Sequence, residues 1–262
     1  MNRFEGKVAI VTGGGAGIGA AAAERLASEG CKVIVTGRRP EPIEKVATAI
    51  GGLALAGDAA DNDHLLAAVE LAEKEFGGLD ILVNNAGTGT GGPLLELELD
   101  EWKRVLDLNL FGAINATRAA IPAMRKRGGG SIVNVSSVSS ARSRLGGAIY
   151  ESSKASLNAM SRSFAVEFAP ERIRSNCVCP GVARTELADY AYGLVAEKKG
   201  VSLEEVYSEI GSVYPMRRVA EAAEVGAVIA FLASDDASFV TGTELTVDGG
   251  GSALNVTTFG IK

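Results

Sequence analysis

Short runs of apolar, β-branched residues alternate along the chain with longer segments in which apolar residues recur at helical spacing. The runs at 7–11, 32–36, 80–84, 131–136 and 173–178 are almost continuously apolar, as parallel strands buried on both faces are. Two weaker strand candidates lie at 53–56 and 244–247, and helical spacing covers 16–29, 62–76, 98–127 and 149–168. The alternation predicts an α/β fold with a doubly wound, seven-stranded parallel sheet and helices on both faces.

No repeat, linker or low-complexity segment divides the 262 residues, so we expect a single domain over 1–262. The stretch 182–215 has no clear period, and we expect it to be irregular and to form a substrate lid at the ligand edge of the sheet. Tyr190, Tyr192, Tyr207 and Tyr214 all lie there, which suits an apolar or ring-shaped substrate.

The formal net charge of −6, without a long basic run, argues against nucleic acid or an anionic membrane as a partner. Three cysteines do not make a disulfide framework, and Cys177-Val-Cys179 is interpreted as strand packing. With no apolar leader or membrane-length run apparent, we expect a cytoplasmic protein. The single histidine, His64, excludes a His-rich metal site, and we expect no metal and a surface position for His64 at a helix start.

A glycine-rich turn follows the first expected strand and opens a helix, whose free N–H groups and dipole can hold a pyrophosphate. Its Gly-x3-Gly-x-Gly spacing departs by one residue from the Rossmann dinucleotide fingerprint but keeps the same physical parts. The candidate cofactor contacts here are Gly13, Gly15, Gly17, Ile18 and Gly19.

The residues after the second expected strand decide which ribose is accepted, because an acid there binds the 2′-hydroxyl and an arginine accommodates a 2′-phosphate. The positions read Gly37-Arg38-Arg39, without an acid. Arg38 and Arg39 therefore favour NADP(H), with NAD(H) still open.

Tyr150 and Lys154 are four residues apart on an expected helix and thus share a face. An adjacent ammonium favours the phenolate, so we expect Lys154 to lower the pKa of Tyr150. Ser137, at the end of the 131–136 strand, offers a hydroxyl that can polarise the same carbonyl oxygen. Asn84-Asn85-Ala86-Gly87 ends another strand with small residues that let backbone lie against a flat ring or sugar.

Thr12 to Gly19, Asn84 to Gly87, Ser137, Tyr150 and Lys154, in this order, resemble the short-chain dehydrogenase/reductase family over essentially the whole chain. The resemblance implies that Ser137 positions the substrate oxygen, Tyr150 exchanges its proton, and Lys154 also holds the nicotinamide ribose. It further implies that Asn109 relays protons through water. The remaining cofactor contacts that it implies are Asp58 and Ala59 on the adenine side, Asn85, Ala86 and Gly87 beside the ring or sugar, and Pro180, Gly181, Val182 and Thr185 near the carboxamide.

The expected activity is hydride transfer between NADP(H) and a small carbonyl or secondary alcohol compound, similar to that of the family's 3-oxoacyl-carrier-protein reductases. The alternatives are an NAD(H)-linked alcohol dehydrogenase and a catalytically silent nucleotide-binding sensor. The helices at 98–127 and 149–168 resemble those through which family members dimerise, and the family's C-terminal strand often contributes to a tetramer, so the resemblance implies a homotetramer. Arg142 and Arg144 lie where substrate choice is expected, either to meet an anionic group or to be solvated.

Overall fold

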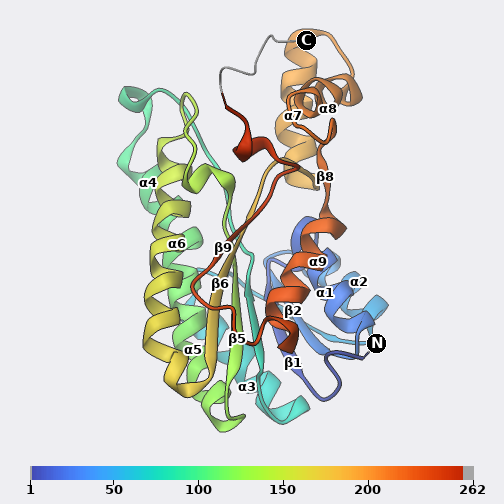
Figure 1. The fold of residues 1–262 in the computed structure, drawn as a ribbon, viewed down its shortest axis with the longest axis vertical. Helices are drawn as coiled ribbons and strands as arrows, with labels where there is room; N and C mark the ends of the chain where they lie inside the picture. The colour runs from blue at the N-terminus through green and yellow to red at the C-terminus, as the bar shows by residue number, and fades with distance from the viewer. Residues whose placement is uncertain (1, 256–262) are drawn as a thin grey trace.

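The computed structural model describes residues 2–255 and contains the predicted seven-stranded parallel sheet (Figure 1). Its strand order is β3-β2-β1-β4-β5-β6-β9. The strands are β1 (Val8–Thr12), β2 (Lys32–Gly37), β3 (Leu53–Ala56), β4 (Ile81–Asn84), β5 (Gly130–Val135), β6 (Ile173–Pro180) and β9 (Glu244–Val247). All seven predicted strands are confirmed, and the order reverses between β1 and β4, where such folds open a ligand crevice.

Helices cover both faces of the sheet, as predicted. One layer holds α1 (Gly17–Ser28), α2 (Pro40–Ile50) and α9 (Ala222–Ala233), and the other holds α3 (Asn62–Phe76), α5 (Gly112–Lys126) and α6 (Ala148–Phe168) (Figure 1). Every residue of β1 and β4 is buried, because each of these central strands packs helices on both sides. Gly226 of α9 lets the two helix backbones approach, since a Cβ there would lie 2.9 Å from the Ala21 carbonyl of α1.

The structure differs from the prediction over 98–127, where one continuous helix was expected. Instead α4 (Leu99–Leu106) runs into a π-helical turn at Asp107–Phe111 before α5 begins. Such π-helical turns are frequent at functional sites, and this one carries Asn109.

The expectation that 182–215 is irregular is wrong. After a short strand β7 (Ala183–Arg184), which pairs with β8 (Ala220–Glu221), the segment forms α7 (Glu186–Lys199) and α8 (Leu203–Ser212). Thr185 caps α7, and Ser202 begins α8 with a capping box. Both helices stand beyond the carboxyl end of β6, where Figure 1 places them above the sheet.

A partly buried ion pair stabilises the opposite end of the sheet, at the amino ends of β1 and β4. The Asp80 carboxylate accepts the Val8 amide at 2.9 Å and is bound by two nitrogens of Arg127, Nε at 3.1 Å and Nη2 at 3.2 Å. Asp80 is 6% exposed, so the arginine compensates a carboxylate that would otherwise be buried without an opposite charge.

Candidate active site

The carboxyl ends of β1 and β4 are joined by side-chain hydrogen bonds at the point where the strand order reverses. The Thr12 hydroxyl accepts the amides of Asn85 and Ala86, both at 3.1 Å. The Asn85 amide group donates back to the carbonyls of Thr12 and Gly13, both at 3.0 Å. These bonds fix the glycine turn against the Asn85-Ala86-Gly87 segment, so the two predicted cofactor segments lie together.

The glycine turn has the close packing that a dinucleotide cradle needs. Gly13 has φ +63°, and a Cβ there would lie 2.9 Å from Ala86 Cα. Gly17 has φ +55° and would place a Cβ 3.0 Å from the Thr185 side chain. The N-cap of α1 is Ala16, which has no side-chain cap, so the first N–H groups of α1 are left for a ligand. This backbone fits a pyrophosphate, with Gly15, Ile18 and Gly19 in the same turn.

Two arginines follow β2 at the ribose end of the crevice, but they differ in their partners. Arg39 Nη2 pairs with Glu186 Oε2 of α7 at 3.0 Å. Arg38 is exposed, and within residues 2–255 its guanidinium forms no ion pair. Arg38 is thus free to meet a phosphate, whereas Arg39 links this edge to α7.

Asp58 follows β3 at the neighbouring strand end. Its Oδ1 accepts the Ala60 amide at 3.0 Å, and the adjacent Ala59 is buried. His64 lies in the first turn of α3 as predicted, but its predicted surface position is wrong because it is only 9% exposed and packs against Gly57. Burial lowers the pKa of His64, and its Nε2 has no partner within the described residues.

Ser137, Tyr150 and Lys154 come together at the carboxyl end of β5. Ser137 begins a single 3-10 turn (Val138–Ser140), where its hydroxyl accepts the Ser139 amide at 3.1 Å and lies close enough to Tyr150 to lower the pKa of the phenol. Lys154 is buried one turn further along α6, with Nζ 5.7 Å from the centre of the Tyr150 ring and 2.8 Å from the Val135 carbonyl. Gly87 completes the group, since a Cβ there would lie 3.5 Å from Lys154 Nζ.

The pKa of Tyr150 is raised in this structure, whereas the sequence predicted that it would be lowered. Burial of the phenol raises the pKa of Tyr150 and outweighs the Ser137 hydrogen bond and the positive charge of Arg144, which both lower it. Burial also lowers the pKa of Lys154 to about 8, so its ammonium is itself destabilised. The phenol of Tyr150 is therefore protonated at neutral pH.

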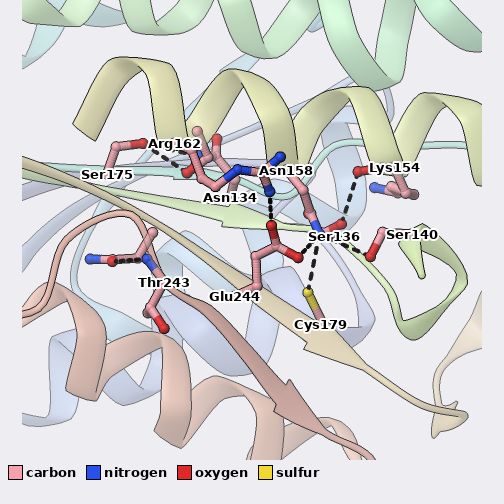
Figure 2. A network of polar contacts seen from close by, with 12 residues as sticks. Asn134, Ser136, Ser140, Lys154, Asn158, Arg162, Ser175, Cys179, Thr243 and Glu244 are labelled. Carbon is pink, nitrogen blue, oxygen red and sulfur yellow. Dashed lines mark hydrogen bonds and ion pairs between the residues drawn. The ribbon is translucent and has the colours of Figure 1, made fainter. Parts of the chain in front are cut away.

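A polar network anchors α6 so that Tyr150 and Lys154 face Ser137. Ser136 Oγ donates to the Lys154 carbonyl at 3.3 Å, which joins the residue before Ser137 to α6. Figure 2 shows Asn158, one turn further, donating to Ser140 Oγ at 2.9 Å, Cys179 Sγ at 3.8 Å and Glu244 at 2.7 Å. These bonds reach β6 and β9, and the Cys179 thiol is buried and packs as predicted.

Asn109 projects from the π-helical turn and is 1% exposed. Its Oδ1 accepts the Thr88 amide at 2.8 Å, while Nδ2 donates to the Thr88 carbonyl at 2.9 Å and to Ser153 Oγ at 3.0 Å. These contacts join the segment after β4 to α6. The sequence analysis did not single out Thr88 or Ser153, although Ser153 lies one turn after Tyr150 on the same helix.

The Pro180-Gly181-Val182 segment leads from the end of β6 toward α7 and α8. The Val182 amide donates to the Tyr214 hydroxyl at 3.2 Å, and the Thr185 hydroxyl accepts the Ala188 amide at 3.2 Å. Thr185 also contacts Gly17, so the start of α7 touches the glycine turn. All predicted cofactor contacts thus lie at the carboxyl ends of the strands.

Three of the four tyrosines in 182–215 contact other residues of this same segment. Tyr207 is 3% exposed, and its hydroxyl donates to Asp189 Oδ1 at 2.6 Å. Tyr192 packs edge-on against Tyr207, with ring centres 5.6 Å apart, and Tyr214 holds Val182. Tyr190 is 71% exposed, so the four tyrosines are a weaker indication of substrate shape than the sequence suggested.

Comparison with known proteins matches this geometry to a family. A family model described as enoyl-(acyl carrier protein) reductase matches residues 13–252. This chain belongs to the short-chain dehydrogenase/reductase family. It is 36% identical to oxidoreductase UcpA of Escherichia coli strain K12, with 100% of each chain covered. It is 39% identical to cis-4-hydroxycyclohexanecarboxylate dehydrogenase of Sinomonas cyclohexanicum, covering 96% of this chain and 98% of the relative.

A solved structure agrees with the fold of this short-chain dehydrogenase/reductase. Ligand-free aldohexose dehydrogenase of Thermoplasma acidophilum superimposes with a TM-score of 0.90 at 37% identity, over 97% of both chains. The chain is therefore an oxidoreductase for alcohol or carbonyl groups that uses a nicotinamide nucleotide. Across residues 2–255, no helix is long and apolar enough to cross a membrane. Within the same span, no group of three or more His, Cys, Asp or Glu side chains is arranged to hold a metal ion.

Proposed function

We propose that this protein is an NADP(H)-dependent oxidoreductase that reduces a small carbonyl compound to a secondary alcohol, with Tyr150 as the acid. The observation that supports this best is the grouping of Tyr150 with Ser137 and Lys154 at the ligand edge of the sheet. When bound, the nicotinamide supplies the hydride to the carbonyl carbon.

The protein's own residues handle the oxygen and its proton. Ser137 and Tyr150 hydrogen-bond the carbonyl oxygen, and Tyr150 donates its proton as negative charge develops there. The raised pKa of Tyr150 keeps the phenol protonated at neutral pH, as an acid that donates to the developing alkoxide requires. Lys154 holds the nicotinamide ribose and replenishes the proton, while Asn109 keeps the segment after β4 in place for the ring.

Arg38 supports the choice of NADP(H), because it is exposed, has no ion pair within residues 2–255 and follows a strand end that lacks an acid. An arginine fork suits a phosphate, and Arg39 is already paired with Glu186. Asp58 and Ala59 would flank the adenine, and Pro180 to Thr185 the carboxamide.

Titration with NADPH and NADH, followed by nicotinamide fluorescence, tests the cofactor without a substrate. We expect NADPH to bind at least about 10-fold more tightly, and Arg38→Ala to remove most of this preference. Arg39→Ala is the matched control and should keep it. Equal affinities for both cofactors would favour an NAD(H)-linked alcohol dehydrogenase, and the absence of binding to either would contradict the proposed enzyme.

The substrate is sought among small ketones and alcohols. The relative from Sinomonas cyclohexanicum is named for a ring alcohol bearing a carboxylate, so cyclic oxo acids belong in the first screen. A homotetramer in the cytoplasm remains our expectation, which sedimentation velocity and cell fractionation test.

A further inference from the structure

We propose that Arg144 binds a carboxylate of the substrate, so that the protein acts on oxo acids and their hydroxy acids. This inference rests on the proposed function, because it places the carboxylate relative to the carbonyl at Tyr150. It concerns the loop 141–147, which leads from the Ser137 turn into α6.

The loop lies against the segment that follows β4, at the mouth of the site. The Gly92 amide donates to the Gly146 carbonyl at 3.0 Å. A Cβ at Gly89 would lie 3.8 Å from the Tyr150 ring, and one at Gly91 would lie 3.7 Å from Arg144 Nη2. Gly89 and Gly91 are only two residues apart, so the Tyr150 ring and the Arg144 guanidinium flank the same short segment at the mouth of the site.

The charge of Arg144 acts on the site and is not neutralised there. It lowers the pKa of Tyr150 and of Tyr192 from α7, and no carboxylate contributes to either shift. Glu151, in the first turn of α6, accepts the backbone amide of Arg144 with its carboxylate at 2.8 Å and is not ion-paired with the guanidinium. Within residues 2–255, Arg144 forms no ion pair, and its side chain is exposed.

The other cations near the mouth are already engaged. Arg104 contacts Thr88, but its guanidinium is bound by both carboxylate oxygens of Glu101. Arg184 pairs with Glu204 and lies over the Tyr207 ring. Lys154 is bonded to the Val135 carbonyl. Arg142, two residues before Arg144, donates to the Ser252 carbonyl. Of these cations at the mouth, Arg144 is the one whose guanidinium has no ion pair within residues 2–255 and can receive a substrate anion.

An arginine that receives a carboxylate in the ground state and the transition state alike affects KM more than kcat. We therefore expect an oxo acid to be reduced with a kcat/KM about 10- to 100-fold above that of its neutral methyl ester, mainly through KM. The probes are 4-oxocyclohexanecarboxylate, 4-oxopentanoate and their methyl esters, with NADPH consumption as the readout.

Arg144→Gln should bring the acid-to-ester ratio to about one, and Arg144→Lys should restore part of the ratio. Arg142→Gln is the matched control and should keep the ratio. An acid-to-ester ratio near one in the wild type, or one that survives Arg144→Gln, would overturn the inference and leave the proposed function intact. Reduction of no carbonyl compound at all would overturn the proposed function, and this inference with it.

Discussion

Replacing Lys154 by methionine is expected to make the protein more stable at neutral pH. Lys154 is buried, and burial lowers its pKa from 10.5 to about 8. Holding the ammonium in the folded state at pH 7 therefore costs on the order of 3 kcal/mol relative to the unfolded chain. Methionine fills a similar volume without a charge, although it loses the bond to the Val135 carbonyl, worth about 1 kcal/mol.

The sign of the pH dependence makes this prediction specific. Below pH 8 Lys154 is protonated in both the folded and the unfolded state, so the folded state bears the full free-energy cost of the buried ammonium. Between pH 8 and 10.5 the folded state loses the proton while the unfolded state keeps it, so wild-type stability rises with pH. The variant lacks this group, so its advantage of about 2 kcal/mol at pH 7 should shrink to about zero near pH 9.5.

Guanidinium denaturation of wild type and Lys154→Met at pH 7 and pH 9.5 measures this difference. Lys45→Met, at an exposed position on α2, is the control and should show no pH-dependent gain. A Lys154→Met gain that does not change with pH, or a loss of stability that is greater at pH 7 than at pH 9.5, would refute the reasoning. Turnover should fall in this variant even as stability rises, because the buried charge serves the site.

Three further substitutions test separate parts of the structure. Arg127→Met should lower the free energy of unfolding, measured by urea denaturation, by about 2 kcal/mol, because it leaves the Asp80 carboxylate buried without its partner. Lys126→Met, at an exposed position, is the control. A loss in Arg127→Met no larger than that in the control would count against this. Gly13→Ala should weaken NADPH binding at least about 10-fold in a fluorescence titration, because its Cβ would meet Ala86. Gly51→Ala, at the same φ of +63° with nothing within 4 Å, should bind NADPH normally, and equal losses in both would contradict the role of close packing. Asn109→Ala removes three hydrogen bonds and should lower Tm by several degrees, measured by calorimetry; an unchanged Tm would show that Thr88 and Ser153 do not depend on it.

The sheet could be predicted from the sequence because its central strands are buried on both faces. Such strands are continuous apolar runs, and runs like Val8–Thr12 and Ile81–Asn84 stand out against the helical spacing around them. The site residues follow from the same logic, since each comes directly after a strand or on the helix that follows. Their order along the chain was enough to indicate the family.

Features set by tertiary packing could not be predicted in this way. Helix α9 is apolar around most of its circumference because it is covered by α1 and the sheet, so it lacks a helical stripe. The break at Asp107–Phe111 leaves no mark in the apolar period, and the lid helices begin at caps that stand among polar residues. The burial of His64 and the desolvation of the Tyr150 phenol likewise depend on neighbours distant in sequence, so neither the position of His64 nor the direction of the Tyr150 pKa shift was predicted correctly.

The most direct test of the account is the rate of Tyr150→Phe with an oxo acid or ketone that the wild type reduces. The variant keeps the ring but lacks the hydroxyl that donates the proton, so we expect kcat to fall about 10²- to 10⁴-fold with NADPH affinity unchanged. Tyr190→Phe, on the exposed side of α7, is the control and should retain full turnover. A Tyr150→Phe rate within a few-fold of the wild type, with the cofactor bound, would contradict the assignment of Tyr150 as the acid.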